Sequence, residues 1–116
     1  MQKIQRIQAN GRLSEVSIYQ NIAYFAGQVA ENTQVDAYFQ SKEVLALIDK
    51  LLAEIGSHKS RILNAQIFLA DMQDYDLMNQ AWDEWVDSNQ PPSRATVEAK
   101  LANPDWKVEI VITAVV

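Results

Sequence analysis

Hydrophobic residues near the N-terminus alternate with polar ones, which predicts strands. A weak alternation covers residues 2–8, around Ile4 and Ile7, and a stronger one covers residues 16–26. The stronger one is interrupted at Gln20-Asn21, which suits a hairpin turn because Asn tolerates a left-handed backbone. Gly27 closes this stretch, and its missing side chain permits close approach by backbone or ligand. We therefore expect an edge strand followed by a hairpin.

The spacing then becomes helical, returns to alternation, and becomes helical again. The first helix is expected from about residue 36 to Gly56, because apolar residues recur there every three or four positions: Val44, Ile48, Leu51, Leu52 and Ile55. A strand follows through alternating apolar residues: Leu63, Ala65, Ile67 and Leu69. A second helix is expected after Asp74, a good N-cap, with one apolar face: Met78, Ala81, Trp82 and Trp85. Pro91-Pro92 ends it, because proline cannot continue a helix.

Two more strands complete the chain, from Arg94 to about Ala99 and from Val108 to Val116, with a turn around Asn103-Pro104 between them. The order β-β-β-α-β-α-β-β predicts an α+β fold with a mixed sheet and both helices on one face. The last strand is apolar on both of its faces, so two helices on one side cannot bury it. Oligomerisation through the sheet is the simplest cover for the other face.

Composition and charge narrow the class of protein. The 116 residues suit one domain, residues 1–116, and 48% hydrophobic with 22% charged residues is an ordinary globular balance. A net charge of -5 with scattered basic residues argues against a nucleic-acid partner. There is no cysteine, no apolar leader and no stretch long enough to span a membrane. We expect a cytoplasmic protein without a membrane partner.

Several kinds of chemical site are disfavoured, and we expect neither a metal nor a cofactor. The three glycines stand singly, so no phosphate-binding loop is present. His58 is the only histidine and is expected to be solvated. The acids Asp71, Asp74 and Asp76 are explained by capping and by the helix dipole.

Two features of the second helix have a structural and a functional interpretation. Trp82 and Trp85 lie three residues apart on an apolar face, which favours packing over a ligand box. Asn79 lies one turn before Trp82, and its side chain could hydrogen-bond to the backbone of a loop or to a ligand. The contact with the backbone is favoured.

Arg94 is the strongest candidate for a ligand contact. It begins a strand directly after the rigid Pro-Pro-Ser segment, and it shares one strand face with Thr96 and Glu98. A guanidinium beside a hydroxyl suits a carboxylate, because arginine offers a planar, bidentate fork of donors. An ion pair with Glu98, or with an acid of a neighbouring chain, is the alternative, and physical chemistry alone leaves both open.

Longer segments resemble a known family in the same order along the chain. The resemblance is carried by Ala-Tyr-Phe-Ala-Gly-Gln-Val, Ile-Leu-Asn-Ala-Gln-Ile-Phe-Leu-Ala-Asp-Met-Gln-Asp-Tyr, Met-Asn-Gln-Ala-Trp-Asp-Glu-Trp, Pro-Pro-Ser-Arg-Ala-Thr-Val-Glu-Ala and Asn-Pro-Asp-Trp-Lys-Val-Glu-Ile-Val-Ile-Thr-Ala-Val. Together they resemble the RidA/YjgF/YER family over almost the whole chain. The Trp-Asp-Glu-Trp-Val and Asn-Pro elements are most similar to its YoaB-like branch.

The resemblance implies a chorismate-mutase-like fold, a homotrimer whose sheets form a central barrel, and pockets at the subunit interfaces. Active members hydrolyse enamines or imines, such as 2-aminoacrylate, to 2-oxo acids and ammonia. By the same resemblance, Arg94 holds the substrate carboxylate, Gly27 and Thr96 line the pocket, and Asn79 lies near it. A non-catalytic trimer that binds small carboxylates is the alternative function.

The chain departs from the family pattern at three polar positions. Val111 aligns with a glutamate of the last strand that is thought to position the hydrolytic water. Glu109 matches the preceding acid, and a shift of ~7 Å along the strand argues against a simple substitution. Ala26 stands where a pocket serine is common, and Leu13 stands where an N-terminal pocket tyrosine is common.

Overall fold

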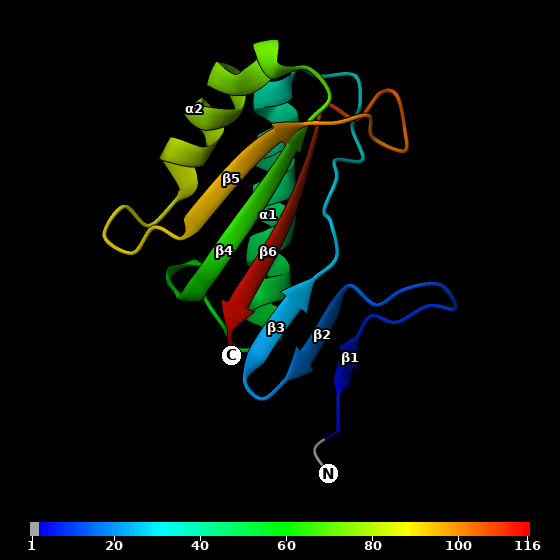
Figure 1. Ribbon diagram of the computed structural model, residues 1–116, viewed down its shortest axis with the longest axis vertical. Helices are drawn as coiled ribbons and strands as arrows, with labels where there is room; N and C mark the ends of the chain where they lie inside the picture. The colour runs from blue at the N-terminus through cyan, green and yellow to red at the C-terminus, as the bar shows by residue number, and fades with distance from the viewer. Residues whose placement is uncertain (1–2) are drawn as a thin grey trace.

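The computed structural model describes residues 3–116 as six strands and two helices (Figure 1). The strands are β1 (Gln5–Ile7), β2 (Val16–Tyr19), β3 (Ile22–Phe25), β4 (Ile62–Leu69), β5 (Ser93–Glu98) and β6 (Val108–Val115). The helices are α1 (Ala37–Glu54) and α2 (Tyr75–Trp85). Two short 3-10 turns, η1 (Lys59–Arg61) and η2 (Met72–Asp74), directly precede β4 and α2. The order of elements is the predicted one. The first strand is shorter than predicted, and residue 2 of that prediction lies outside the described residues.

The six strands form one mixed sheet in the order β1-β2-β3-β6-β4-β5. β4 and β5 run parallel and are joined by α2, while every other pair is antiparallel. β6 therefore lies between two strands that precede it in the chain, and β5 is an edge strand. In Figure 1, α1 lies behind the sheet and α2 lies beside β5. Both helices pack into one core with the sheet, which confirms the predicted α+β fold.

The turns and helix ends follow from local sequence. Gln20 and Asn21 both have positive φ, 51° and 67°, the backbone of the two-residue turn that suits twisted hairpins. Asp36 caps α1 through its side chain, and Gly56 (φ 74°) lies just past the end of the helix. α2 begins after Asp74 as predicted, but this side chain makes no capping hydrogen bond. The side-chain cap lies earlier, where Asp71 accepts from the Gln73 amide in η2.

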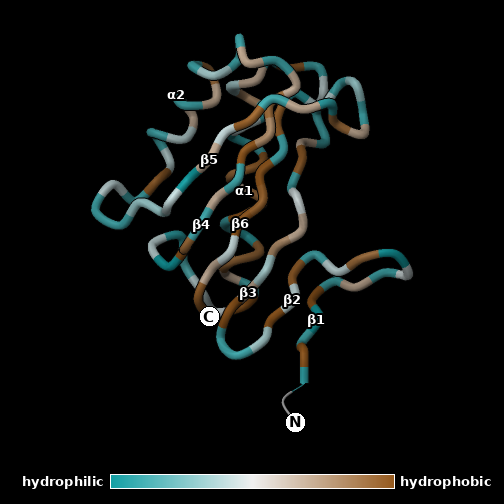
Figure 2. Tube along the Cα trace, viewed as in Figure 1, coloured by the Kyte–Doolittle hydropathy of each residue, from teal (hydrophilic) through white to brown (hydrophobic). Residues whose placement is uncertain are grey.

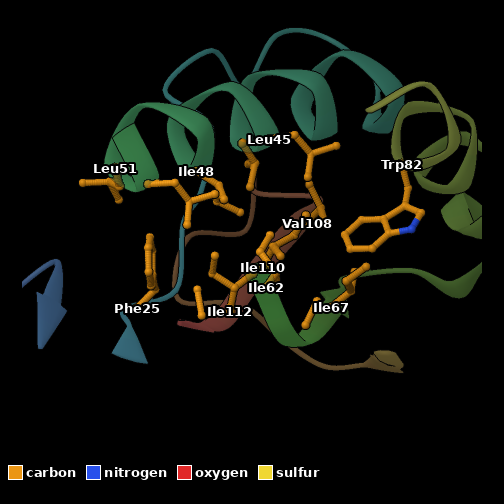
Figure 3. Close-up of a cluster of buried hydrophobic side chains, with 14 of the residues drawn as sticks. Phe25, Leu45, Ile48, Leu51, Ile62, Ile67, Trp82, Val108, Ile110 and Ile112 are labelled. Atoms are coloured by element: carbon orange, nitrogen blue, oxygen red, sulfur yellow. The ribbon is translucent and has the colours of Figure 1, made fainter. Parts of the chain in front are cut away.

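The core lies between the sheet and the two helices. Apolar side chains of β3, β4 and β6 meet those of α1 and α2, as Figure 3 shows for Ile48, Trp82 and Ile110. The predicted alternation of apolar residues holds from Ala65 onward but not at Leu63, whose side chain is 48% exposed. An irregularity of register between Ile62 and Asn64 moves Ile62 into the core instead.

The opposite face of the sheet also carries many apolar residues, and neither helix of residues 3–116 covers it. β6 places Val108, Ile110, Ile112 and Ala114 in the core, so its other residues lie on the uncovered face. Tyr24, on the same face of neighbouring β3, is 55% exposed. Figure 2 shows hydrophobic residues along most of β6, as the two-faced pattern predicts. Neither helix is long and apolar enough to cross a membrane within the described part of the chain.

Candidate functional site

Arg94 lies at the start of the edge strand β5, and its side chain points toward α2. Its Cα pairs with that of Ala65, a buried residue on the helix-covered face, so Arg94 lies on that face too. Nη1 donates to Oδ1 of Asn79 at 2.7 Å, and Nη2 lies 3.4 Å from the hydroxyl of Tyr75. Cζ lies 5.3 Å from the ring centroid of Trp82. One helix face therefore holds the guanidinium.

All of these partners are uncharged. Arg94 is half-buried, and its one further side-chain contact, with the sulfur of Met78, is neutral as well. The predicted alternative, an ion pair with Glu98 of the same chain, does not form, because that carboxylate accepts from the Met72 amide at 3.0 Å. A partly desolvated cation with neutral neighbours is a good receptor for an anionic ligand, because no carboxylate beside it already neutralises its charge.

Asn79 serves the arginine rather than the backbone. The backbone role favoured from the sequence is wrong, because its carbonyl oxygen accepts from Arg94. Trp82, in contrast, is packed in the core as predicted, with 6% of its surface exposed. Trp85 donates from Nε1 to Asp49 on α1 at 2.8 Å, so it joins the two helices.

The backbone of β5 offers further donors beside Arg94. The Ala99 amide donates to the Leu69 carbonyl of β4 at 3.0 Å. Amide directions alternate along a strand, so the amides of Val97 and Ala95 also point at β4, whereas those of Thr96 and Arg94 point to the free edge. The Thr96 hydroxyl is buried without a hydrogen-bond partner. Arg94 and Thr96 thus lie together, as expected.

Gly27 lies against the carboxylate of Glu109. A Cβ built on Gly27 would stand 1.9 Å from Oε2 of Glu109, so the glycine leaves space for that side chain. The two are brought together by the pairing of Gln28 with Ile110 at the end of β3. We expected a backbone or a ligand to come close to Gly27, and the structure places an acidic side chain there instead. This acid is Glu109, two residues before Val111. The sequence argues against Glu109 as a simple replacement for the family glutamate, and its approach to Gly27 was not predicted.

The two remaining pocket candidates lie apart from Arg94. Ala26 is half-buried beside Gly27, and its amide donates to the Glu15 carbonyl. Leu13 is 46% exposed in the loop between β1 and β2, which projects from the sheet (Figure 1). Asn10 fixes that loop by accepting from the amides of Arg12 and Leu13.

One chain does not bring Arg94 and Glu109 together. Glu109 lies on β6 and Arg94 on β5, with β4 between them, and two strand spacings of ~4.8 Å amount to about 10 Å. Glu109 pairs with Phe68 and Arg94 with Ala65, so the two residues are also about 10 Å apart along the strands. Arg94 also lies on the helix-covered face, whereas Glu109 alternates with core residues and lies on the other face. A site that uses both groups therefore needs a second copy of the chain.

His58, for which the sequence indicated no chemical role, makes hydrogen bonds only within its own loop among the described residues. His58 is exposed, and its Nδ1 lies at hydrogen-bond distance from the amide and hydroxyl of Ser60 at the start of η1. Within residues 3–116, no three His, Asp or Glu side chains gather closely enough to hold a metal ion.

Comparison with known proteins decides the family. The model of a family described as endoribonuclease L-PSP matches residues 3–116. The chain belongs to this family. It is 73% identical to a RutC family protein of Haemophilus influenzae, covering 96% of this chain and 97% of the relative. It is 50% identical to the RutC family protein YoaB of Escherichia coli, covering 97% and 98%. The predicted RidA/YjgF membership and YoaB-like branch are confirmed.

More distant relatives and solved structures extend the likeness. The chain is 33% identical to the 3-aminoacrylate deaminase RutC of Acinetobacter baylyi over 81% of its own length and 79% of that protein. The fold is similar to the crystal structure of a YjgF family member from Neisseria meningitidis, with a TM-score of 0.94 and 46% identity. That likeness covers 97% of this chain and 94% of the other. Membership of the family supports a deaminase-type role.

Proposed function

We propose that the protein hydrolyses reactive enamines and imines that carry a carboxylate, such as 2-aminoacrylate, to 2-oxo acids and ammonia. The observation that carries this proposal is the half-buried guanidinium of Arg94, which has only uncharged partners. Membership of a family that includes a similar 3-aminoacrylate deaminase favours the same class of substrate. Arg94 is the binding residue for the carboxylate, and the free amide of Thr96 is a second donor.

The reaction needs a water molecule and a group that accepts its proton. The enamine first isomerises to the imine, and water then adds to the carbon of the C=N bond. The carboxylate of Glu109 accepts a proton from that water and returns it to nitrogen, which gives a carbinolamine. Collapse of this intermediate forms the C=O bond and releases ammonia. Holding the imine on Arg94 beside the water supplies much of the rate, because addition to an imine is intrinsically easy.

The assembly that unites these groups is a homotrimer in this proposal. Arg94 of one copy and Glu109 of the next would meet where the free edge at β5 of one sheet adjoins the uncovered face of the other. Apolar side chains of the uncovered face favour the packing, among them Tyr24 and Val97, each about half exposed. The projecting loop that carries Leu13 would then line a neighbouring copy's pocket.

We expect the protein to sediment with about three times its chain mass of 13.1 kDa. Burial of the second apolar sheet face drives this association. Sedimentation equilibrium over a hundredfold range of concentration would measure it. A single species with the mass of one chain would contradict the shared site as well as the trimer.

The proposed reaction is tested with the unmodified protein. A pyridoxal-phosphate dehydratase generates 2-aminoacrylate, and its loss is followed by trapping or by absorbance, with and without the protein. We expect the lifetime of the enamine to fall in proportion to the protein added. A lifetime equal to that in buffer, at high protein concentration, would reject the enzymatic function.

A carboxylate-binding regulatory trimer is the second candidate, favoured by the apolar side chains at Ala26 and Val111. Both functions predict that 2-oxobutyrate binds. Only the enzyme shortens the lifetime of the enamine, so the two assays together separate these functions.

A further inference from the structure

Besides Met78, three side chains of α2 converge on the guanidinium, and two of these three have assigned roles. Tyr75, Asn79 and Trp82 follow one another at spacings of four and three residues, so they lie on one helix face. Asn79 accepts from Nη1, and the ring of Trp82 packs against the planar group. Together these two contacts fix the plane of the guanidinium. Tyr75 is the remaining member of the face.

The hydroxyl of Tyr75 is oriented by its arginine neighbour. Arginine has donors and no acceptor, so across the 3.4 Å between Nη2 and the hydroxyl oxygen the guanidinium donates and the tyrosine accepts. The hydroxyl proton must then point away from Arg94. Tyr75 is 39% exposed, so this proton faces solvent or a ligand.

An anion bound to Nη2 comes within reach of the same hydroxyl. A carboxylate oxygen that accepts from Nη2 lies ~2.8 Å from it, and the Tyr75 oxygen is on the same side of the fork. The tyrosine can therefore donate to the oxygen that the arginine binds. The oxygen of a free carboxylate is charged and accepts both hydrogen bonds strongly, whereas the carbonyl oxygen of a carboxamide is neutral and accepts weaker ones.

We propose that Tyr75 is a second ligand-binding residue of the Arg94 site, donating its hydroxyl proton to the ligand's carboxylate and selecting free acids over carboxamides. This assignment rests on the proposed function for its ligand class. It adds a residue of α2 to a site otherwise built on β5. It also gives the reaction a defined substrate, the imine of a free 2-oxo acid rather than of its amide or ester.

Tyr75→Phe tests the assignment, because it removes one hydroxyl and keeps the ring. We expect the Kd for 2-oxobutyrate, measured by calorimetry on the full chain, to rise about tenfold to 100-fold, the size of one hydrogen bond to a charged group. The Kd of 2-oxobutyramide should rise several times less, because its oxygen is neutral. Tyr38→Phe is the matched control, since that hydroxyl donates to Glu84 between the helices, and its Kd should equal that of the unmodified protein.

Binding and turnover separate the two proposals. Equal Kd values for 2-oxobutyrate in Tyr75→Phe and the unmodified protein would overturn the assignment of Tyr75, whatever the enzymatic result. An equal rise in Kd for the acid and the amide would also overturn it, because that pattern indicates a general disturbance of the pocket. Binding with the expected Kd ratio but without enamine hydrolysis would uphold Tyr75 and reject the proposed reaction. Absence of binding by the unmodified protein would reject both.

Discussion

Replacing Arg94 with alanine is expected to lower kcat/KM for enamine hydrolysis by at least about 30-fold. The change removes the charged partner of a carboxylate in a partly desolvated site, which typically costs 2–5 kcal/mol, or about 30-fold to several thousandfold. Asn79 would also lose its donor. The rate of loss of 2-aminoacrylate, measured at several substrate concentrations, gives the ratio directly.

Two further variants show whether charge or geometry is responsible. Arg94→Lys keeps the positive charge without the planar fork, so we expect an intermediate loss of about tenfold. Arg61→Ala is the control, because Arg61 is exposed and its Nε donates to the Val115 carbonyl on the far side of β4. An Arg94→Ala protein that melts at the usual temperature and retains full kcat/KM would exclude this residue as the carboxylate anchor.

Glu109→Gln is expected to lower kcat by about 100-fold while KM changes by no more than about threefold. Glutamine has the same shape but accepts no proton from water, and the loss of a positioned base typically reduces rates by 10²–10⁴-fold. Steady-state kinetics with 2-aminoacrylate measures both constants. An unchanged kcat would indicate that water attacks without this carboxylate.

Gly27→Ala is expected to displace the same carboxylate, because Gly27 lies directly against Glu109. The new Cβ would occupy the place of Oε2, so Glu109 must swing away and kcat should fall to a similar degree. The matched control is Gly11→Ala, because a Cβ at Gly11 meets nothing within 4 Å. Full activity in Gly27→Ala would show that the position of Glu109 against Gly27 is unimportant for the reaction.

Much of the fold could be predicted because its helices, turns and strands depend on patterns among neighbouring residues. The periodicity of α1, the Gln20-Asn21 turn and the two apolar faces of β6 each depend on neighbouring residues. Leu63 was misplaced because the irregularity beside it depends on how β4 pairs with β6, which strand alternation does not reveal. The sequence therefore misleads where the side on which a residue lies is set by pairing with a distant strand rather than by the local alternation of residues.

The same distinction explains the candidate site. The face of Arg94 followed from strand alternation, and its anchor role was implied by the family resemblance. Its partner Asn79 and the approach of Glu109 to Gly27 depend on contacts between distant segments, across 15 and 82 positions of the chain. An isolated glycine that closes a strand was the only sequence signal for the second contact, and it did not name the acid.

The position of β6 has a consequence for biosynthesis. This strand lies between β3 and β4 but leaves the ribosome after both. Until it emerges, the hairpin and the unit of β4, α2 and β5 each expose an unpaired edge, and neither can complete the core. The sheet therefore closes only when synthesis has passed its last strand, and a nascent chain stalled before Val108 presents two open edges to chaperones.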